Sequence, residues 1–329
     1  MEVKPEQDGA TPKSDRPAGS SLRRRAVRMV LRLAIVVGVI VLMLTLFQRS
    51  LIYVPTKTRP LPAAQFGLAR GGAFDVQTDS DGVTLHGWHC LPHGAVAADS
   101  AECDRLLRDA SHVVLFFSGN AGHRGYRLDE LELLRRLGCH VFLFDYRGYA
   151  ENEGRPSESA FVGDALQIWR YVTEERRVSP DKVIVVGESL GGGVAVQLAA
   201  QLCARGSPPG GLVLRSTFSS LVDVGRYHFP WLPVRWALID RFLSHEHIRQ
   251  VTCPVLLFHG TSDTIVPERF GRKLFAAAPE RSATGVEKQF VELPGVGHNN
   301  VLDEAGNVVA QQLSKWFDRI RGRGERVRG

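Results

Sequence analysis

The sequence predicts an α/β fold in which a mostly parallel, doubly wound sheet carries helices on both faces and a short cap, with one membrane helix before it. Three observations predict this class. Short apolar runs typical of buried strands alternate along the chain with stretches typical of helices. The residues suited to chemistry fall where these strands end, as they do in doubly wound sheets. The composition, 44% hydrophobic and 23% charged, is that of a globular protein.

The order of the elements follows from the apolar runs. Residues 74–78 and 83–90 predict an antiparallel pair joined by the turn Ser80-Asp81-Gly82. Later strands are expected at residues 112–117, 140–144, 182–187, 211–215, 255–259 and 288–293. Helices are expected at residues 124–137, 157–173, 189–205, 268–277 and 300–320. The spread of these elements favours one catalytic domain, at residues 73–318.

A serine stands at the sharpest predicted turn of the chain. The apolar run 182–186 leads into Gly187-Glu188-Ser189-Leu190-Gly191, and a helix-like segment follows. A nucleophile elbow needs strand, turn and helix in this order, with glycines that let strand and helix approach closely. The turn by itself could be merely structural. Because a serine hydroxyl is a poor nucleophile alone, the catalytic interpretation requires a base and an orienting acid downstream.

Both partners follow Ser189 in the required order. Asp263 lies in the loop after the strand at 255–259, and His298 lies in the loop after the strand at 288–293. The order Ser, Asp, His is typical of hydrolases with such an elbow. His298 is therefore predicted to take the serine proton, and Asp263 to orient its imidazole. Alternatively, Asp263 caps the helix that begins near Pro267, or His298 makes only local hydrogen bonds.

The loop Ser118-Gly119-Asn120-Ala121-Gly122 is the candidate for the oxyanion hole. It follows the strand at 112–117, so it should lie at the same sheet edge as Ser189. The backbone N–H of Asn120 is predicted to join that of Leu190 in binding the developing oxyanion. By contrast, His259 at a strand end is predicted to be structural. Asp145 is predicted to pair with Arg147 or to order its turn.

Residues 216–250 interrupt the alternation of strands and helices and are predicted to form a short cap over the site. Phe229, Trp231 and Trp236 lie in this segment. These aromatic side chains are predicted as possible acyl-binding residues that line a groove. They could equally form a hydrophobic plug for the domain itself.

These motifs together resemble the α/β-hydrolase superfamily, and within it the membrane-anchored abhydrolase domain-containing branch, which includes acyl-protein thioesterases. The resemblance covers nearly everything from Phe47 to Phe317. It implies hydrolysis of an ester or thioester and leaves the substrate open. One position departs from the pattern, because that family usually has histidine where Ser118 stands. The matching stretches are Gly119-Asn120-Ala121-Gly122, Asp145-Tyr146-Arg147-Gly148-Tyr149, Glu153-Gly154-Arg155-Pro156-Ser157-Glu158, Gly187-Glu188-Ser189-Leu190-Gly191-Gly192, Ser216-Thr217-Phe218-Ser219-Ser220, His259-Gly260-Thr261-Ser262-Asp263 and Gly297-His298-Asn299.

The N-terminal region predicts a membrane anchor. An arginine cluster at 23–25 precedes a charge-free apolar run at 33–47. The run alone is short of the ~20 residues of a membrane span, but a helix at 26–48 suffices if Arg28 and Arg32 reach the interface. A cleaved signal peptide is the alternative, although no small-x-small cleavage site follows. The remaining segments are predicted as a disordered basic N-terminus (1–25), a linker (49–72) and a basic tail (319–329).

The charge distribution excludes a nucleic-acid binder and predicts a topology. The net charge is +6, but residues 1–32 and residues 319–329 each carry +4, so the rest of the chain carries −2. A nucleic-acid protein would carry its basic stripe on the domain. The arginine cluster predicts a single-pass protein with its N-terminus in the cytoplasm and its catalytic domain on the extracytoplasmic side, bound to the lipid bilayer through the helix.

No metal or organic cofactor is predicted. The five cysteines form no C-x-x-C and no zinc spacing, and pairing of Cys90 with Cys103 stays open. The predicted function is a serine hydrolase that cleaves an acyl ester or thioester through an acyl-enzyme on Ser189. A serine peptidase of the same fold and a non-catalytic binding protein are the alternatives, although a non-catalytic protein would be expected to lack one of the three triad residues.

Overall fold

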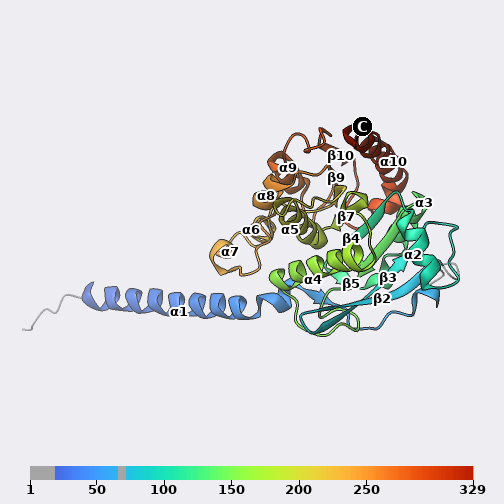
Figure 1. The fold of residues 1–329 in the computed structure, drawn as a ribbon. Coiled ribbons are helices and arrows are strands. Elements are labelled where there is room, and N and C mark those ends of the chain that lie inside the picture. Colours follow the sequence, from blue (N-terminus) through green and yellow to red (C-terminus); the bar gives the residue numbers. More distant parts are fainter. Residues whose placement is uncertain (1–18, 66–71, 329) are drawn as a thin grey trace, which may run out of the picture. The chain divides into compact units, whose positions relative to one another are not determined.

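The computed structural model describes residues 19–65 and 72–328, with side chains described from residue 23 to residue 321. The chain divides into two compact units, of which the first ends at Leu46 and the second begins at Phe47. The second unit contains the sheet and its covering helices (Figure 1). The resulting fold is the predicted α/β class, with a mixed sheet flanked by helices.

An eight-stranded sheet organises the second unit, in the order β10-β9-β8-β7-β4-β6-β3-β2 (Figure 1). The strands from β10 to β6 pair in parallel, whereas β3 pairs antiparallel with both β6 and β2. The predicted strands are confirmed to within one residue at each bound, except that the first ends two residues later than predicted. Their bounds are β2 Ala73–Ser80, β3 Val83–Cys90, β4 Val113–Phe117, β6 His140–Phe144, β7 Val183–Glu188, β8 Gly211–Arg215, β9 Val255–Gly260 and β10 Gln289–Leu293.

Helices cover both faces of this sheet because its central strands are apolar on both sides. In β7, Val183 and Val185 pack into one core cluster, while Ile184 and Val186 pack into the cluster on the opposite face. The first cluster includes buried residues of α2, α4, α5 and α9, and the second includes those of α3 and α10. Their bounds are α2 Ser100–Arg108, α3 Leu128–Arg136, α4 Glu158–Arg170, α5 Leu190–Ala204, α9 Glu268–Ala277 and α10 Val301–Arg328.

Some of the helices that cover the sheet differ from the expectation, and α3 begins at Leu128 instead of residue 124. Helix α2 was not predicted, because small residues precede it and its apolar positions are few. Its local signal is an N-cap, since the Asp99 side chain accepts a hydrogen bond from the Glu102 N–H. Helix α10 runs on through the expected basic tail to Arg328. The five cysteines are free thiols, so Cys90 and Cys103 are not paired.

The predicted cap contains three short helices rather than a folded lid. They are α6 Leu221–His228, α7 Val234–Ala237 and α8 Ser244–His247. Ser220 begins the first of them by accepting a hydrogen bond from the Asp223 N–H. The cap therefore adds little secondary structure to the domain, as its length predicts.

The N-terminal helix α1, Gly19–Ile52, is longer than the predicted span. Its part Arg23–Ile52 is long and apolar enough to cross a membrane, by length and composition. A short strand β1, Val54–Pro55, follows almost at once and pairs in parallel with β5, Ala121–Gly122. The first part of the segment expected to be a linker is therefore part of the folded domain.

Replacing Gly191 by alanine is expected to destabilise the domain. Its added Cβ would collide with the carbonyl oxygen of Phe117 at the end of β4, and backbone cannot move aside cheaply. We expect a loss on the order of 2 kcal/mol or more in the free energy of unfolding. Thermal unfolding of the full chain in detergent measures it.

Gly163→Ala is the matched control for this change. Gly163 lies inside α4, and a Cβ there would meet nothing within 4 Å. This variant should be slightly stabilised, by roughly 0.5–1 kcal/mol, because alanine favours the helix. Equal melting temperatures for the two variants would contradict the close packing at Gly191.

Candidate active site

Ser189 occupies a strained turn between β7 and α5. Its backbone has φ +51° and ψ −116°, a region that non-glycine residues rarely adopt. Two hydrogen bonds hold it there, since the Ser189 N–H donates to the Arg215 carbonyl at 2.9 Å and the Thr217 hydroxyl donates to the Ser189 carbonyl at 2.7 Å. The predicted elbow geometry is present, with the serine side chain at the apex.

The structure brings Ser189, His298 and Asp263 together in one chain of contacts. His298 Nε2 lies 3.1 Å from Ser189 Oγ, and His298 Nδ1 lies 2.7 Å from Asp263 Oδ2. The three residues come from the turn after β7 and the loops after β9 and β10. Both distances lie within hydrogen-bond reach, which is the arrangement that a serine nucleophile and its base require.

Asp263 is held as a buried acceptor. Its Oδ1 accepts hydrogen bonds from the backbone N–H groups of Ile265 at 2.9 Å and Val266 at 2.7 Å. Burial by itself would raise the pKa of Asp263, but contacts with His259 and His298 outweigh it and lower the pKa from 3.8 to about 2. The carboxylate is therefore ionised at neutral pH, and it favours the tautomer of His298 that carries its proton on Nδ1.

His259 supports this carboxylate from behind. Its Nε2 lies 2.8 Å from the Val266 carbonyl oxygen and 3.4 Å from Asp263 Oδ2, and its side chain is fully buried. The structural role predicted for His259 fits this placement, but its contact with Asp263 was not foreseen. The alternative in which Asp263 caps a helix is met only in part. Its Oδ1 accepts from backbone N–H groups just before α9, but not from those of the helix itself.

The candidate oxyanion loop lies beside the elbow. A Cβ added to Gly119 would stand 3.6 Å from Ser189 Cβ, so the two backbones are neighbours. Leu190 is the first residue of α5, and the N–H groups of a first helical turn have no partner within the helix. The Tyr146 hydroxyl donates to the Ser118 carbonyl at 2.8 Å and supports the loop. Whether Asn120 and Leu190 donate to an oxyanion stays a prediction.

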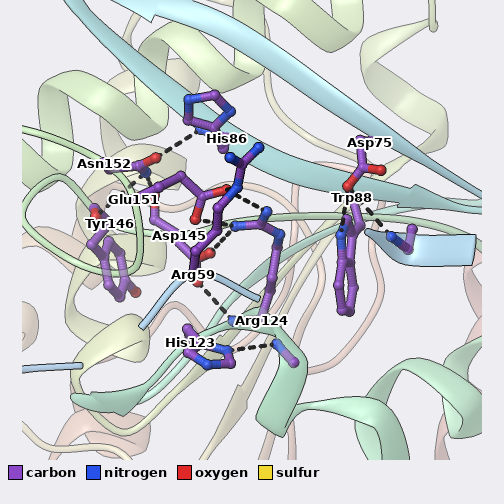
Figure 2. A network of polar contacts seen from close by, with 12 residues as sticks. Arg59, Asp75, His86, Trp88, His123, Arg124, Asp145, Tyr146, Glu151 and Asn152 are labelled. Carbon is purple, nitrogen blue, oxygen red and sulfur yellow. Dashed lines mark hydrogen bonds and ion pairs between the residues drawn. The ribbon is translucent and has the colours of Figure 1, made fainter. Parts of the chain in front are cut away.

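A buried ionic network holds the chain that follows this loop (Figure 2). Arg124 pairs with Asp145 through its side chain, and its backbone N–H donates to Asp145 Oδ1 at 2.7 Å. The same guanidinium reaches Glu151 at 2.7 Å. The pairing of Asp145 with Arg147 predicted from sequence is wrong, because Arg147 pairs instead with Asp164. The side chains of residues close together on a tight turn point in different directions, so each of the two finds its partner on another element.

A second ionic cluster at the elbow was missed in the sequence. The Glu188 carboxylate lies 2.9 Å from Arg215, and Arg215 lies 2.9 Å from Glu130. Burial would raise the pKa of Glu188, but the neighbouring Arg215 lowers it overall. The cluster ties the residue before Ser189 to β8 and α3. No sequence signal marks it, since the position before the elbow serine is variable in the motif.

The cap aromatics are exposed. Their side chains lie on and beside the connection between α6 and α7, with exposed fractions of 49% for Phe229, 72% for Trp231 and 85% for Trp236. Phe229 and Trp231 contact each other edge to face. They are therefore open surface in this structure, and acyl binding by them stays a prediction.

The stability contributed by Asp263 is expected to depend on pH. Because its pKa is lower in the folded protein, it stabilises the folded state above pH 4 and loses this effect as the pH falls toward about 2. At neutral pH the free energy of unfolding of wild type should exceed that of Asp263→Asn by roughly 2 kcal/mol, and its melting temperature should be correspondingly higher. This difference should shrink across that acid range. Asp81→Asn, in an exposed turn, is the control, and a constant difference for Asp263→Asn would contradict the shift.

Comparisons with known proteins agree with the fold. A family model described as the alpha/beta hydrolase fold matches residues 112–238. The uncharacterized protein Rv2307c of Mycobacterium tuberculosis is 41% identical over 298 residues, which are 90% of this chain and 97% of that protein. The lysophosphatidylserine lipase ABHD12 of Danio rerio is 36% identical over 231 residues, and the match spans 64% of this chain and 60% of that protein.

Solved structures show the same architecture at low sequence identity. The esterase Pf2001 of Pyrococcus furiosus is similar with a TM-score of 0.60 and 14% identity, covering 82% of this chain and 99% of that one. Est1E of Butyrivibrio proteoclasticus, solved with ferulic acid, has a TM-score of 0.58 and 17% identity, covering 75% and 99%. The chain therefore belongs to the α/β-hydrolase superfamily and is an enzyme of its serine hydrolase class.

Proposed function

We propose that this chain hydrolyses carboxylic esters or thioesters through an acyl-enzyme on Ser189. The contact series Ser189–His298–Asp263, with distances of 3.1 and 2.7 Å, is the observation that carries the proposal. His298 Nε2 takes the proton as Ser189 Oγ attacks the carbonyl carbon. The oxyanion accepts hydrogen bonds from the N–H groups of Asn120 and Leu190. His298 then protonates the leaving alcohol or thiol, and water releases the acid by the same steps.

The substrate class we propose is an acyl ester or thioester presented at or near a membrane. Two features support this. The helix Arg23–Ile52 could anchor the chain in a bilayer. The Danio rerio relative is a lysophosphatidylserine lipase, and the chain spans 60% of its length. The orientation with the domain outside the cytoplasm stays a prediction from the arginine cluster. Protease added to intact cells or spheroplasts tests it, because the domain should be digested if it lies outside.

Labelling with a fluorophosphonate probe tests the nucleophile. The wild-type chain should be labelled, and Ser189→Ala should not, because its Cβ methyl cannot bond to phosphorus. His298→Ala should lose turnover by a similar factor, since triad members act as a unit, whereas Asp263→Asn should be impaired but retain more turnover. Ser262→Ala, beside Asp263 in sequence, is the control and should label normally. Persistent labelling of Ser189→Ala would place the nucleophile elsewhere. An ester, thioester and peptide panel separates the peptidase alternative.

The dependence of kcat/KM on acyl length tests the role of the cap. If an acyl chain packs on Trp231, each added methylene should contribute up to about 0.8 kcal/mol until the surface is covered. With p-nitrophenyl esters of increasing length, kcat/KM should rise for wild type and rise less for Trp231→Ala. Tyr126→Ala removes an exposed aromatic ring outside the cap and is the control. A flat profile that Trp231→Ala leaves unchanged would reject acyl binding by the cap and keep the hydrolase assignment.

A further inference from the structure

Residues 48–56, which we call the juxtamembrane segment, comprise the last turn of α1 and the strand β1. They contact both the candidate oxyanion loop and the cap. We propose that this segment is a positioning element of the active site, which holds the oxyanion loop through the side chain of Asn120. The proposal rests on the proposed function, in which the Asn120 N–H binds the oxyanion.

The side chain of Asn120 makes hydrogen bonds through both its amide nitrogen and its amide oxygen, to this segment and to one tyrosine. Its Nδ2 donates to the Ile52 carbonyl at 2.5 Å, and its Oδ1 accepts from the Val54 N–H at 3.3 Å. The same Oδ1 accepts from the Tyr149 hydroxyl at 2.9 Å. Because both polar ends of the amide are occupied, the side chain is a bridge from the loop to the end of α1. It acts on the reaction only through its own backbone.

Backbone pairing extends this bridge on both sides of Asn120. Val54 and Pro55 lie in parallel register with Ala121 and Gly122 of the loop. The carbonyl of Thr56 accepts a hydrogen bond from the Ala150 N–H at 2.7 Å. The segment thus lies against the loop as an added strand, and not as a free linker.

The other side of the segment is tied to the cap. Gln48 donates to the Ala237 carbonyl at 3.1 Å and accepts from the Ile239 N–H at 2.7 Å. Arg49 makes a two-point contact with Asp240, at 2.9 and 3.1 Å, and the buried Tyr53 hydroxyl donates to the same carboxylate at 2.9 Å. Asp240 itself is 3% exposed. These contacts fix the position of Ile52 and Val54 relative to the domain.

The loop needs such support because its own backbone is permissive. Glycines stand at 119 and 122, and Gly122 has φ +84°. Oxyanion donors must lie within a window of about 0.4 Å, at roughly 2.7–3.1 Å from the oxyanion, and a misplacement of about 1 Å can cost 10²-fold in rate. Tyr146 holds the Ser118 carbonyl and Arg124 holds the chain beyond the loop. Between them, the contacts on Asn120 set the position of its N–H.

Steady-state kinetics of the full chain in detergent, on a soluble short-chain p-nitrophenyl ester, tests this inference. Asn120→Ala keeps the backbone N–H and removes the bridge, so kcat should fall about tenfold or more while KM changes less than about threefold. Asp240→Ala should lower kcat in the wild-type background but add little in the Asn120→Ala background, because both act through one contact. Tyr53→Phe replaces Asp240→Ala if that variant does not fold.

A pH profile separates positioning from a general loss of structure. In Asn120→Asp, an ionised carboxylate oxygen faces the Ile52 carbonyl, whereas a protonated one can donate to it. The ratio of its kcat to that of wild type should therefore rise as the pH falls. The same ratio for Asn120→Ala should stay flat. Leu51→Ala, at an exposed position of the same helix turn, is the matched control and should keep wild-type kcat.

The outcomes distinguish this inference from the proposed function. If Ser189→Ala is inactive but Asn120→Ala keeps kcat within about twofold of wild type, the positioning role is overturned and the hydrolase assignment stands. Additive effects of Asp240→Ala and Asn120→Ala would also overturn it, since the two residues would then act independently. Full activity of Ser189→Ala would instead reject the nucleophile, and the inference with it.

Discussion

The close approach of α5 to the ends of β4 and β7 is the constraint on which the site depends. At Gly191 there is no room for a side chain, because the backbone of Phe117 and Ser118 occupies its place. This close approach accompanies the tight turn in which Ser189 has positive φ. It also brings the loop after β4 beside the serine. Ser189 and the candidate oxyanion loop are therefore neighbours for one packing reason.

Electrostatics around this turn follow from burial. Asp263, Asp145 and Glu188 all lie largely out of water, where an unpaired carboxylate would be costly. Each has partners that match its position: histidines and backbone N–H groups for Asp263, and arginines for the other two. Only the first of these faces Ser189 through an imidazole. The two arginine pairs tie adjoining elements together, so similar buried charges serve different purposes in one site.

The last turn of the N-terminal helix packs against the catalytic domain and is part of it. Residues from Gln48 to Thr56 make hydrogen bonds with both the cap and the oxyanion loop. If the helix spans a bilayer, the residues that contact the loop and the cap lie at the C-terminal end of that helix and directly after it in sequence. The short sequence separation between this helix and the residues that contact the loop fits the proposed membrane-presented acyl substrate.

Much of the fold of this protein can be predicted from its sequence, because strands, helices and the elbow each depend on a short stretch of residues. The apolar runs determine the strands, and the glycines around Ser189 determine the elbow between β7 and α5. Asp263 and His298 could be predicted as neighbours of Ser189 because parallel strands end at one sheet edge, so residues far apart in the chain converge there. The superfamily follows from these same motifs.

Only the tertiary structure decided which partners meet across elements. Asp145 pairs with Arg124 and not with its near neighbour Arg147, since side-chain direction on a turn is not a matter of spacing. The pairing of Val54 and Pro55 with Ala121 and Gly122 joins residues nearly seventy positions apart, and two residues carry no strand pattern. Buried donors and acceptors must be satisfied, and which partners they find depends on where the packed elements place them.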